Sequence, residues 1–325
     1  MRILMRSFLI LGITLSILAI VMVIRYSIGL HNANQINAKL QLQKIKVSPV
    51  NSVEILPVVE YLTARSDLRT EDGISYLIKA GGQSILMDVG YNRKAEEVSP
   101  LIHNMDRLGI KLDEIDAMAI SHCHADHVGG MGFRDKKINL SSTPVELDGK
   151  KVYTPIPMYC DSAVAIPIEK PSLITPEIGS TGPMAAEIFV PGQLREQSLL
   201  INLHGKGLVL ISGCGHPEII RMVKTARKIT GLPVYAVIGG FHMYYTKVDS
   251  LFWRNLFGSN RLFSRSMTKQ EVADTIEELK AMGIKKVFIS PHDADQATLD
   301  LFAKTFRSDC EPVMAGKSII LGGDN

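Results

Sequence analysis

Short apolar segments bounded by turn-forming residues recur along the chain after residue 52. Each is five to ten residues long and dominated by apolar side chains, a pattern that predicts β-strands. The predicted strands are residues 53–62, 74–80, 84–90, 117–121, 197–203, 207–213, 233–240, 286–290 and 317–321. Gly81 and Gly82 separate the second from the third, and the sequence HGKG joins the fifth to the sixth. Both connections predict β-hairpins.

Apolar residues at helical spacing alternate with these segments. They predict helices over residues 95–108, 217–230, 269–282 and 294–306. Strands and helices therefore alternate in both halves of the chain, which favours an α/β fold built in layers. Since no linker-like boundary separates the halves, we predict one domain over residues 53–325.

The pattern weakens between residues 133 and 187, where prolines recur and little periodicity is left. Long irregular segments in compact domains are usually lids or disordered loops. We interpret residues 133–187 as an insertion in the domain that covers a pocket.

One apolar segment is longer than all the others. Residues 8–24 form seventeen positions without a charge, and Arg25 follows directly. A helix of this length rises about 25 Å, near the lower limit for crossing a bilayer. The apolar part of a cleaved signal peptide is usually about 7–15 residues and ends in small residues. We therefore favour an uncleaved membrane anchor over residues 1–30, with a cleaved signal peptide as the alternative.

The charges around this segment bear on its orientation. Arg2, Arg6 and the terminal amine favour a cytoplasmic tail, whereas Arg25 and three lysines between residues 39 and 46 weigh in the other direction. We predict that the body lies outside the cytoplasm. The stretch 31–52, rich in Asn, Gln and Lys, is interpreted as a polar tether.

Composition limits the remaining functions. Apolar residues make up 46% of the chain and charged residues 21%, which is typical of a globular protein. The net charge is only +3, and no basic run alternates with aromatic residues, so no nucleic-acid partner is predicted. Two of the four cysteines lie beside metal-capable histidines, which argues against a disulfide framework. A Cys160–Cys310 bridge stays open.

The sequence SHCHADHVGG, at residues 121–130, concentrates metal-capable side chains directly after a predicted strand. His122 and His124 are two residues apart and can point to one side of an extended loop, whereas the adjacent Asp126 and His127 diverge. This spacing favours two neighbouring metals, one for each pair. Without a cation, the clustered imidazoles would repel when protonated and would leave buried polar groups unpaired. Zinc is expected, with iron or manganese as alternatives.

Three later histidines, His216, His242 and His292, each follow an apolar strand after one to three small or turn-forming residues. Side chains just past neighbouring strand ends meet at one edge of a sheet, where α/β enzymes place their sites. His204 lies in a predicted hairpin turn and is not included. A single histidine is more often structural than a ligand, so this prediction depends on the whole set.

Together these motifs resemble the metallo-β-lactamase superfamily. SHCHADHVGG resembles its HxHxDH signature, and ILMDVG, which contains Asp88, is similar to an earlier strand end. The sequences TPEIGSTGP, REQSLLI, GLVLISGCGHPEII, YAVIGGFH and PHDAD resemble the branch named for 7,8-dihydropterin-6-methyl-4-(β-D-ribofuranosyl)aminobenzene-5′-phosphate synthase, over about residues 53–322.

The resemblance implies an αββα sandwich of two mixed sheets with a metal pair at one edge. The positions that match its ligands are His122, His124, Asp126, His127, His216 and His292. The sequence HDAD at residues 292–295 departs from an expected Cys-Thr-Gly type sequence. The usual bridging aspartate has no clear counterpart, and Cys214 is a candidate substitute.

The predicted function is a metal-dependent hydrolase of a small molecule, with a metal-activated water at a mono- or dinuclear zinc-type site. Asp126 is the candidate that orients the water, and His242 is the candidate contact to the substrate. Three alternatives stay open: a synthase-type activity of the resembled branch, a metal-dependent binding or sensor domain without turnover, and a thiol-based role for Cys123 and Cys214.

Overall fold

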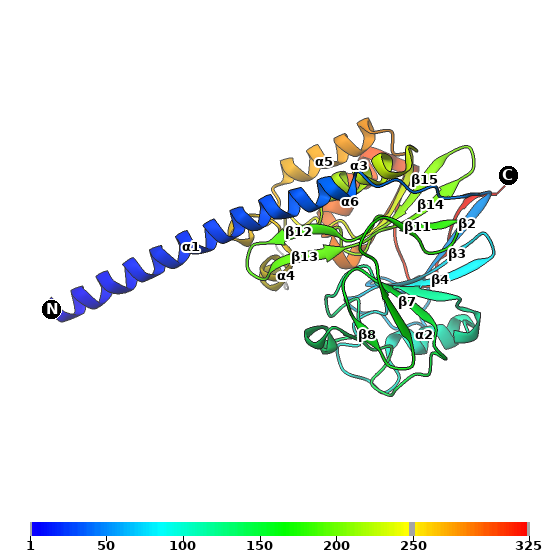
Figure 1. Ribbon diagram of the computed structural model, residues 1–325, viewed down its shortest axis with the longest axis horizontal. Helices are drawn as coiled ribbons and strands as arrows, with labels where there is room; N and C mark the ends of the chain where they lie inside the picture. Colours follow the sequence, from blue (N-terminus) through cyan, green and yellow to red (C-terminus); the bar gives the residue numbers. More distant parts are fainter. Residues whose placement is uncertain (1, 247–250, 324–325) are drawn as a thin grey trace.

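Two mixed β-sheets lie face to face in the computed structural model, which describes residues 2–246 and 251–323 (Figure 1). The first sheet has the order β19-β2-β3-β4-β5-β7-β9. Its strands are β2 (Ser52–Val59), β3 (Ser75–Ala80), β4 (Gln83–Met87), β5 (Ala117–Ala119), β7 (Lys151–Thr154), β9 (Val164–Pro167) and β19 (Ile319–Gly322). The strands from β19 to β4 pair antiparallel, and those from β4 to β9 pair parallel.

The second sheet has the order β10-β11-β14-β15-β16-β17-β18, with β1 beside β14. Its strands are β1 (Pro49–Val50), β10 (Ser172–Leu173), β11 (Ile178–Ser180), β14 (Leu199–Leu203), β15 (Gly207–Ile211), β16 (Val234–Gly239), β17 (Lys286–Ile289) and β18 (Cys310–Pro312). The predicted hairpins β3–β4 and β14–β15 are both present. Two small sheets join β6 (Lys137–Ile138) to β8 (Tyr159–Cys160) and β12 (Met184–Ile188) to β13 (Gly192–Glu196).

Helices cover the outer faces of both sheets (Figure 1). Helix α2 (Pro100–Leu108) packs on the first sheet, and α3 (Ile219–Thr230), α5 (Lys269–Ala281) and α6 (Gln296–Phe306) pack on the second. Helix α2 begins at Pro100 rather than at residue 95, because Ser99 caps its first turn and proline is favoured at the first helical position. Short 3-10 helices cover Leu112–Glu114, Met131–Asp135, Leu262–Ser264, Pro291–Asp293 and Arg307–Asp309.

The apolar core has the three layers that a four-layer αββα sandwich requires. Side chains of both sheets meet in the central layer, for example Ile55 and Ile78 from the first sheet and Ile201 and Ile238 from the second. The other two layers lie between each sheet and its helices. The predicted fold class is therefore confirmed. Cys160 and Cys310 lie in different sheets, and both are free thiols.

Residues 133–187 differ from the predicted insertion, because their strands belong to both main sheets. Strand β7 pairs with β5 and β9, and β11 pairs with β14. These strands are only three or four residues long, so they are too short to show a periodic pattern. Of the predicted lid, Phe133 and Arg134 line the cavity at the site described below.

Helix α1 (Arg2–Leu40) is continuous, which differs from the predicted change at residue 30 from an anchor to a tether. Its second half packs on the body through Tyr26, Ala33, Asn37 and Leu40, which are buried. Asn37 donates to the carbonyl of Ala185 and accepts from its N–H, both at 2.8 Å. Its first half projects away from the body (Figure 1) and is long and apolar enough to cross a membrane.

Candidate metal centre

The predicted histidines converge at one edge of the sandwich, just past the ends of neighbouring strands. The loop after β5 carries His122, and the loops after β15 and β16 carry His216 and His242. The 3-10 helix after β17 carries His292. Ring centroids lie 4.9 Å apart for His122 and His216, 4.9 Å for His216 and His242, and 5.5 Å for His127 and His292. The parallel strands β15, β16 and β17 place their ends together, as expected.

Two groups of possible metal ligands lie side by side at this edge. The first group is His122, His124 and His216, and the second is Asp126, His127, Cys214 and His292. Within each group, one ligand atom from every member lies within 4.8 Å of the others. His122 and His124 thus fall in one group and Asp126 and His127 in the other, which is the pairing that their spacing predicts.

The first group contains a buried ring nitrogen that has no hydrogen-bond partner among the described residues. His216 donates from Nδ1 to the carbonyl of Gly258 at 3.1 Å, and its buried Nε2 has no partner among the described residues. Nδ1 of His122 lies 3.0 Å from the Ser121 hydroxyl, and its Nε2 lies 3.2 Å from Nδ1 of His124. Unpaired buried acceptors are costly unless a cation fills the space between them. These side chains fit a metal ion.

In the second group, the carboxylate of Asp88 binds the ring nitrogen of His127 that faces away from Cys214. His127 donates from Nδ1 to Asp88 at 2.7 Å, which leaves its Nε2 3.0 Å from the sulfur of Cys214. Asp88 also accepts from the hydroxyl and the backbone N–H of Ser121, both at 2.7 Å. A carboxylate behind the far nitrogen is the usual support of a metal-ligating histidine.

His292 has similar support through a hydroxyl group. Its Nδ1 lies 2.6 Å from the oxygen of Ser290, which in turn donates to the buried Glu60 at 2.6 Å. Nε2 of His292 lies 3.4 Å from the sulfur of Cys214. Burial raises the pKa of Glu60 to about 7. Neither Glu60 nor Ser290 is predicted from the sequence, because each becomes part of the site only through a long-range contact.

Burial keeps most of these imidazoles neutral. It lowers the pKa of His124 and His292 to about 4 and that of His122 and His216 well below the ordinary value, and neighbouring imidazoles add to the effect at His122 and His216. Neutral imidazole is the form that binds a metal.

The pKa values of His127 and Cys214 are raised rather than lowered. Although burial opposes it, the charges of Asp126 and Asp88 raise the pKa of His127 to about 9. Burial raises the pKa of the Cys214 thiol well above its ordinary value. A cation between the two would favour neutral imidazole and thiolate, because it repels the proton of the first and stabilises the charge of the second.

A buried carboxylate fixes the loop that carries Cys214 and His216. Glu196, the last residue of β13, accepts backbone N–H groups from Cys214 at 3.1 Å, from Gly215 at 2.8 Å and from His216 at 2.9 Å. Burial raises the pKa of Glu196 to about 7. Glu196 is not among the predicted site residues, and its signal in the sequence is its place in the motif REQSLLI.

His242 belongs to neither group of ligands, and Asp293 holds it beside them. Asp293 accepts from the backbone N–H of His242 at 2.8 Å and from its Nδ1 at 3.0 Å. Although burial opposes it, His242 holds the pKa of Asp293 well below its ordinary value. Nε2 of His242 is buried without a partner among the described residues. The first aspartate of HDAD therefore positions His242.

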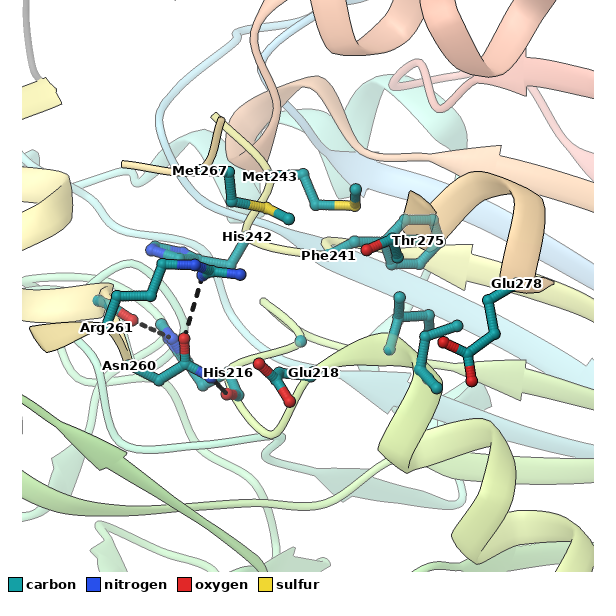
Figure 2. A pocket seen from close by; sticks show the side chains of 14 residues that line it. His216, Glu218, Phe241, His242, Met243, Asn260, Arg261, Met267, Thr275 and Glu278 are labelled. Atoms are coloured by element: carbon teal, nitrogen blue, oxygen red, sulfur yellow. Dashed lines mark hydrogen bonds between the residues drawn. The ribbon is translucent and has the colours of Figure 1, made fainter. Parts of the chain in front are cut away.

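A cavity of about 320 Å³ opens over both groups of ligands. Its polar wall includes His124, Asp126 and His242, and its other wall is formed by Tyr91, Met131, Phe133, Arg134, Arg254 and Phe257. A second cavity of about 200 Å³ lies behind His216 and His242 (Figure 2). Figure 2 shows these two rings at one side of the second cavity and Glu278 of α5 at the other.

Comparison with known proteins agrees with this fold. Residues 70–217 match the family model of the metallo-beta-lactamase superfamily. A curated relative from Methanocaldococcus jannaschii, the 7,8-dihydropterin-6-methyl-4-(beta-D-ribofuranosyl)-aminobenzene-5′-phosphate synthase, is 26% identical over 314 residues and covers 85% of this chain and 99% of its own. A crystal structure of Tm1679, described as a metal-dependent hydrolase of the beta-lactamase superfamily, matches with a TM-score of 0.59 at 19% identity, and the match covers 83% of this chain and 100% of that one.

The fold and the candidate site thus define a metallo-β-lactamase-fold protein with grouped metal-ligand side chains. Residues 70–217 match the family model of the metallo-beta-lactamase superfamily, and the chain is similar to the curated pterin synthase over 85% of its length.

Proposed function

We propose that the chain is a metal-dependent hydrolase of a small molecule, held at a membrane by α1. The observation that carries this proposal is the pair of ligand groups. Each member offers one ligand atom within 4.8 Å of the others, and Nε2 of His216 is buried without a partner among the described residues. The cavity above them has the size of a small-molecule site. Its walls combine a few convergent polar groups with aromatic side chains, as is usual for such sites.

Metal ions bound by the two groups, zinc in the first instance and iron or manganese as alternatives, would supply Lewis acidity and lower the pKa of a coordinated water to about 7. His122, His124 and His216 would hold one ion, and Asp126, His127, Cys214 and His292 the other. Asp126 also lies on the cavity wall, where its carboxylate can orient a water molecule and accept its proton.

His242 would transfer a proton on the substrate side of the site. Asp293 fixes the proton of the imidazole on Nδ1, so the catalytic exchange would take place at Nε2, on a side chain that lines the cavity. Protonated Nε2 can donate to the leaving group of the substrate. Phe133 and Phe257 supply apolar surface to the cavity beside this transfer.

Removal of metal tests the proposed function directly. We expect the purified full chain to contain close to two transition-metal ions, by elemental analysis. Chelation should abolish hydrolysis in a screen of esters, lactones, lactams and phosphodiesters, and added zinc, iron or manganese should restore it. A chain without tightly held metal, and indifferent to added metal, would contradict the proposal.

The curated relative favours a second candidate, a synthase-type reaction. The same metal-loaded chain would then form the pterin product named for that relative and hydrolyse none of the screened substrates. Retained metal with neither activity would indicate a binding or sensor domain.

Membrane anchoring is supported by the exposure of the first half of α1. Its apolar side chains from Met5 to Ile20 are more than half exposed, and they contact none of the described core layers. Arg6 precedes the apolar segment, which favours a body outside the cytoplasm.

Gly258 offers a test of the role of His242. A Cβ atom at this position would lie 2.2 Å from Cε1 and 2.7 Å from Nε2 of His242, so Gly258→Ala must displace the ring. We expect kcat to fall by about 100-fold, which is the scale of a lost proton-transfer group, while the metal content stays unchanged. Kinetics with elemental analysis check this, and Gly12→Ala, at a helical glycine of α1 with open space around it, tests whether any glycine substitution has the same effect. An unchanged kcat would remove His242 from the reaction.

A further inference from the structure

Exposed aromatic side chains gather on helix α4 (Leu251–Gly258) and on the following 3-10 helix. We call Phe252, Trp253, Phe257 and Phe263 the aromatic surface, and their exposed fractions are 67%, 60%, 51% and 62%. Trp253 stacks on Phe257 with ring centroids 6.1 Å apart, and it contacts Phe252 at 5.1 Å. Contiguous exposed apolar side chains of this kind mark an interaction site.

The aromatic surface is continuous with α1. Phe263 contacts Phe189 at 5.3 Å between ring centroids, and Phe189 contacts Tyr26 of α1 at 5.5 Å. The hydroxyl of Tyr26 donates to the carbonyl of Asn260, which lies between α4 and Phe263. Figure 1 shows α4 at the end of the body from which α1 projects.

The apolar part of α1 ends at this junction. The apolar stretch of the helix precedes Arg25, which donates to the carbonyl of Phe189 and pairs with Glu187. The twenty residues before Arg25 that begin at Met5 rise about 30 Å, the thickness of the hydrocarbon layer. If α1 crosses the bilayer, the aromatic surface therefore lies at the level where the helix leaves the membrane.

We propose that the aromatic surface rests in the interfacial layer of the bilayer that α1 spans. This inference depends on the membrane anchoring in the proposed function. Tryptophan and tyrosine favour this layer because their rings are apolar and their N–H or O–H groups can still reach water. Continuity with the membrane-spanning helix favours lipid as the occupant, since any other partner would have to fit between the body and the membrane.

This position would bring the catalytic cavity to the membrane. Phe257 belongs both to the aromatic surface and to the wall of the cavity over the two ligand groups. The next residue, Gly258, accepts the hydrogen bond from His216. The mouth of the cavity would thus open at the bilayer interface, where amphiphilic molecules concentrate.

Trp253 makes the test specific, because it is the only tryptophan in the chain. The full chain is reconstituted in vesicles of phosphatidylcholine and phosphatidylglycerol in equal parts, with lipids brominated either near the headgroup or near the chain end. We expect a blue shift of the Trp253 emission and stronger quenching by the shallow bromines. Flotation of the same sample separately reports whether α1 holds the chain on the vesicles.

Two variants place the single tryptophan, which is the fluorescent probe, at another position of the chain. Trp253→Phe with Ile320→Trp places it on β19, at the end of the body opposite to α1, and no quenching is expected there. Trp253→Phe with Phe257→Trp places it at the mouth of the cavity, where quenching is expected. If that second probe is not quenched, the cavity does not open at the interface.

The outcomes separate the two proposals. A chain that floats with the vesicles while Trp253 stays unquenched overturns the docking of the aromatic surface and leaves the anchor intact. A chain that does not float overturns the anchor and the docking with it. A blue shift without lipid that depends on protein concentration indicates a second copy on the aromatic surface, and also overturns the proposal.

Discussion

His124→Ala is expected to lose both turnover and the metal ion of the first ligand group, with the fold unchanged. His124 is one of the three proposed ligands that the described residues supply to this group, and its Nδ1 lies 3.2 Å from Nε2 of His122. Removal of a partner behind a metal ligand already costs about 10–100-fold in affinity or activity, so loss of the ligand itself should cost more. Because His124 lies on a cavity wall and in none of the apolar core layers, thermal stability of the metal-free chain should be unaffected.

The matched control is His204→Ala. His204 is an exposed histidine in the turn between β14 and β15. This turn lies where β15 begins, whereas the site lies just past the residue where β15 ends. We expect wild-type metal content, activity and melting temperature for this control. If His124→Ala matched it in metal content and activity, the proposed ligand groups would be wrong.

Glu196→Ala is expected to have the second large effect, on stability and on metal binding together. The substitution leaves three buried N–H groups, those of Cys214, Gly215 and His216, without an acceptor. Each buried donor without a partner costs about 1–3 kcal/mol, so the free energy of unfolding should fall by about 3 kcal/mol or more. Metal affinity should fall as well, because the same loop carries one ligand of each group.

Denaturant titration and elemental analysis measure the two effects. Gln193→Ala, at an exposed position on the same strand, should change the free energy of unfolding by no more than about 0.5 kcal/mol. Glu196→Gln keeps one acceptor oxygen and should lie between wild type and Glu196→Ala. Stability and metal content equal to wild type in both Glu196 variants would show that this carboxylate does not hold the loop.

The departures from the superfamily pattern have counterparts in the structure. Within HDAD, Asp293 holds His242, and Asp295 caps α6 by accepting from the N–H of Thr298 at 2.8 Å. Cys214, the candidate substitute for the bridging aspartate, lies within 3.4 Å of His127 and His292. Cys214 thus supplies a thiol to a ligand group that has no clear counterpart of the bridging aspartate.

Much of the fold followed from local patterns. The strands that were predicted are buried along most of their length, so their apolar character was visible in the sequence, as for β15 and β16. Strands such as β11 escaped detection because three residues are too few to show a period. The helical form of residues 31–40 also escaped detection, because their polar side chains find buried partners only when α1 packs on β12, as Asn37 does.

The amino-acid sequence by itself determined the α/β character of the body, the ligand cluster at residues 122–127 and the apolar segment of α1, because each depends on residues close together along the chain. Only the tertiary structure decided which later residues join each ligand group, which carboxylates stand behind them and which surface lies beside α1. Those choices depend on contacts between residues as far apart as Glu60 and Ser290, which meet only when both sheets have assembled. Spacing along the chain carries no information about such pairs.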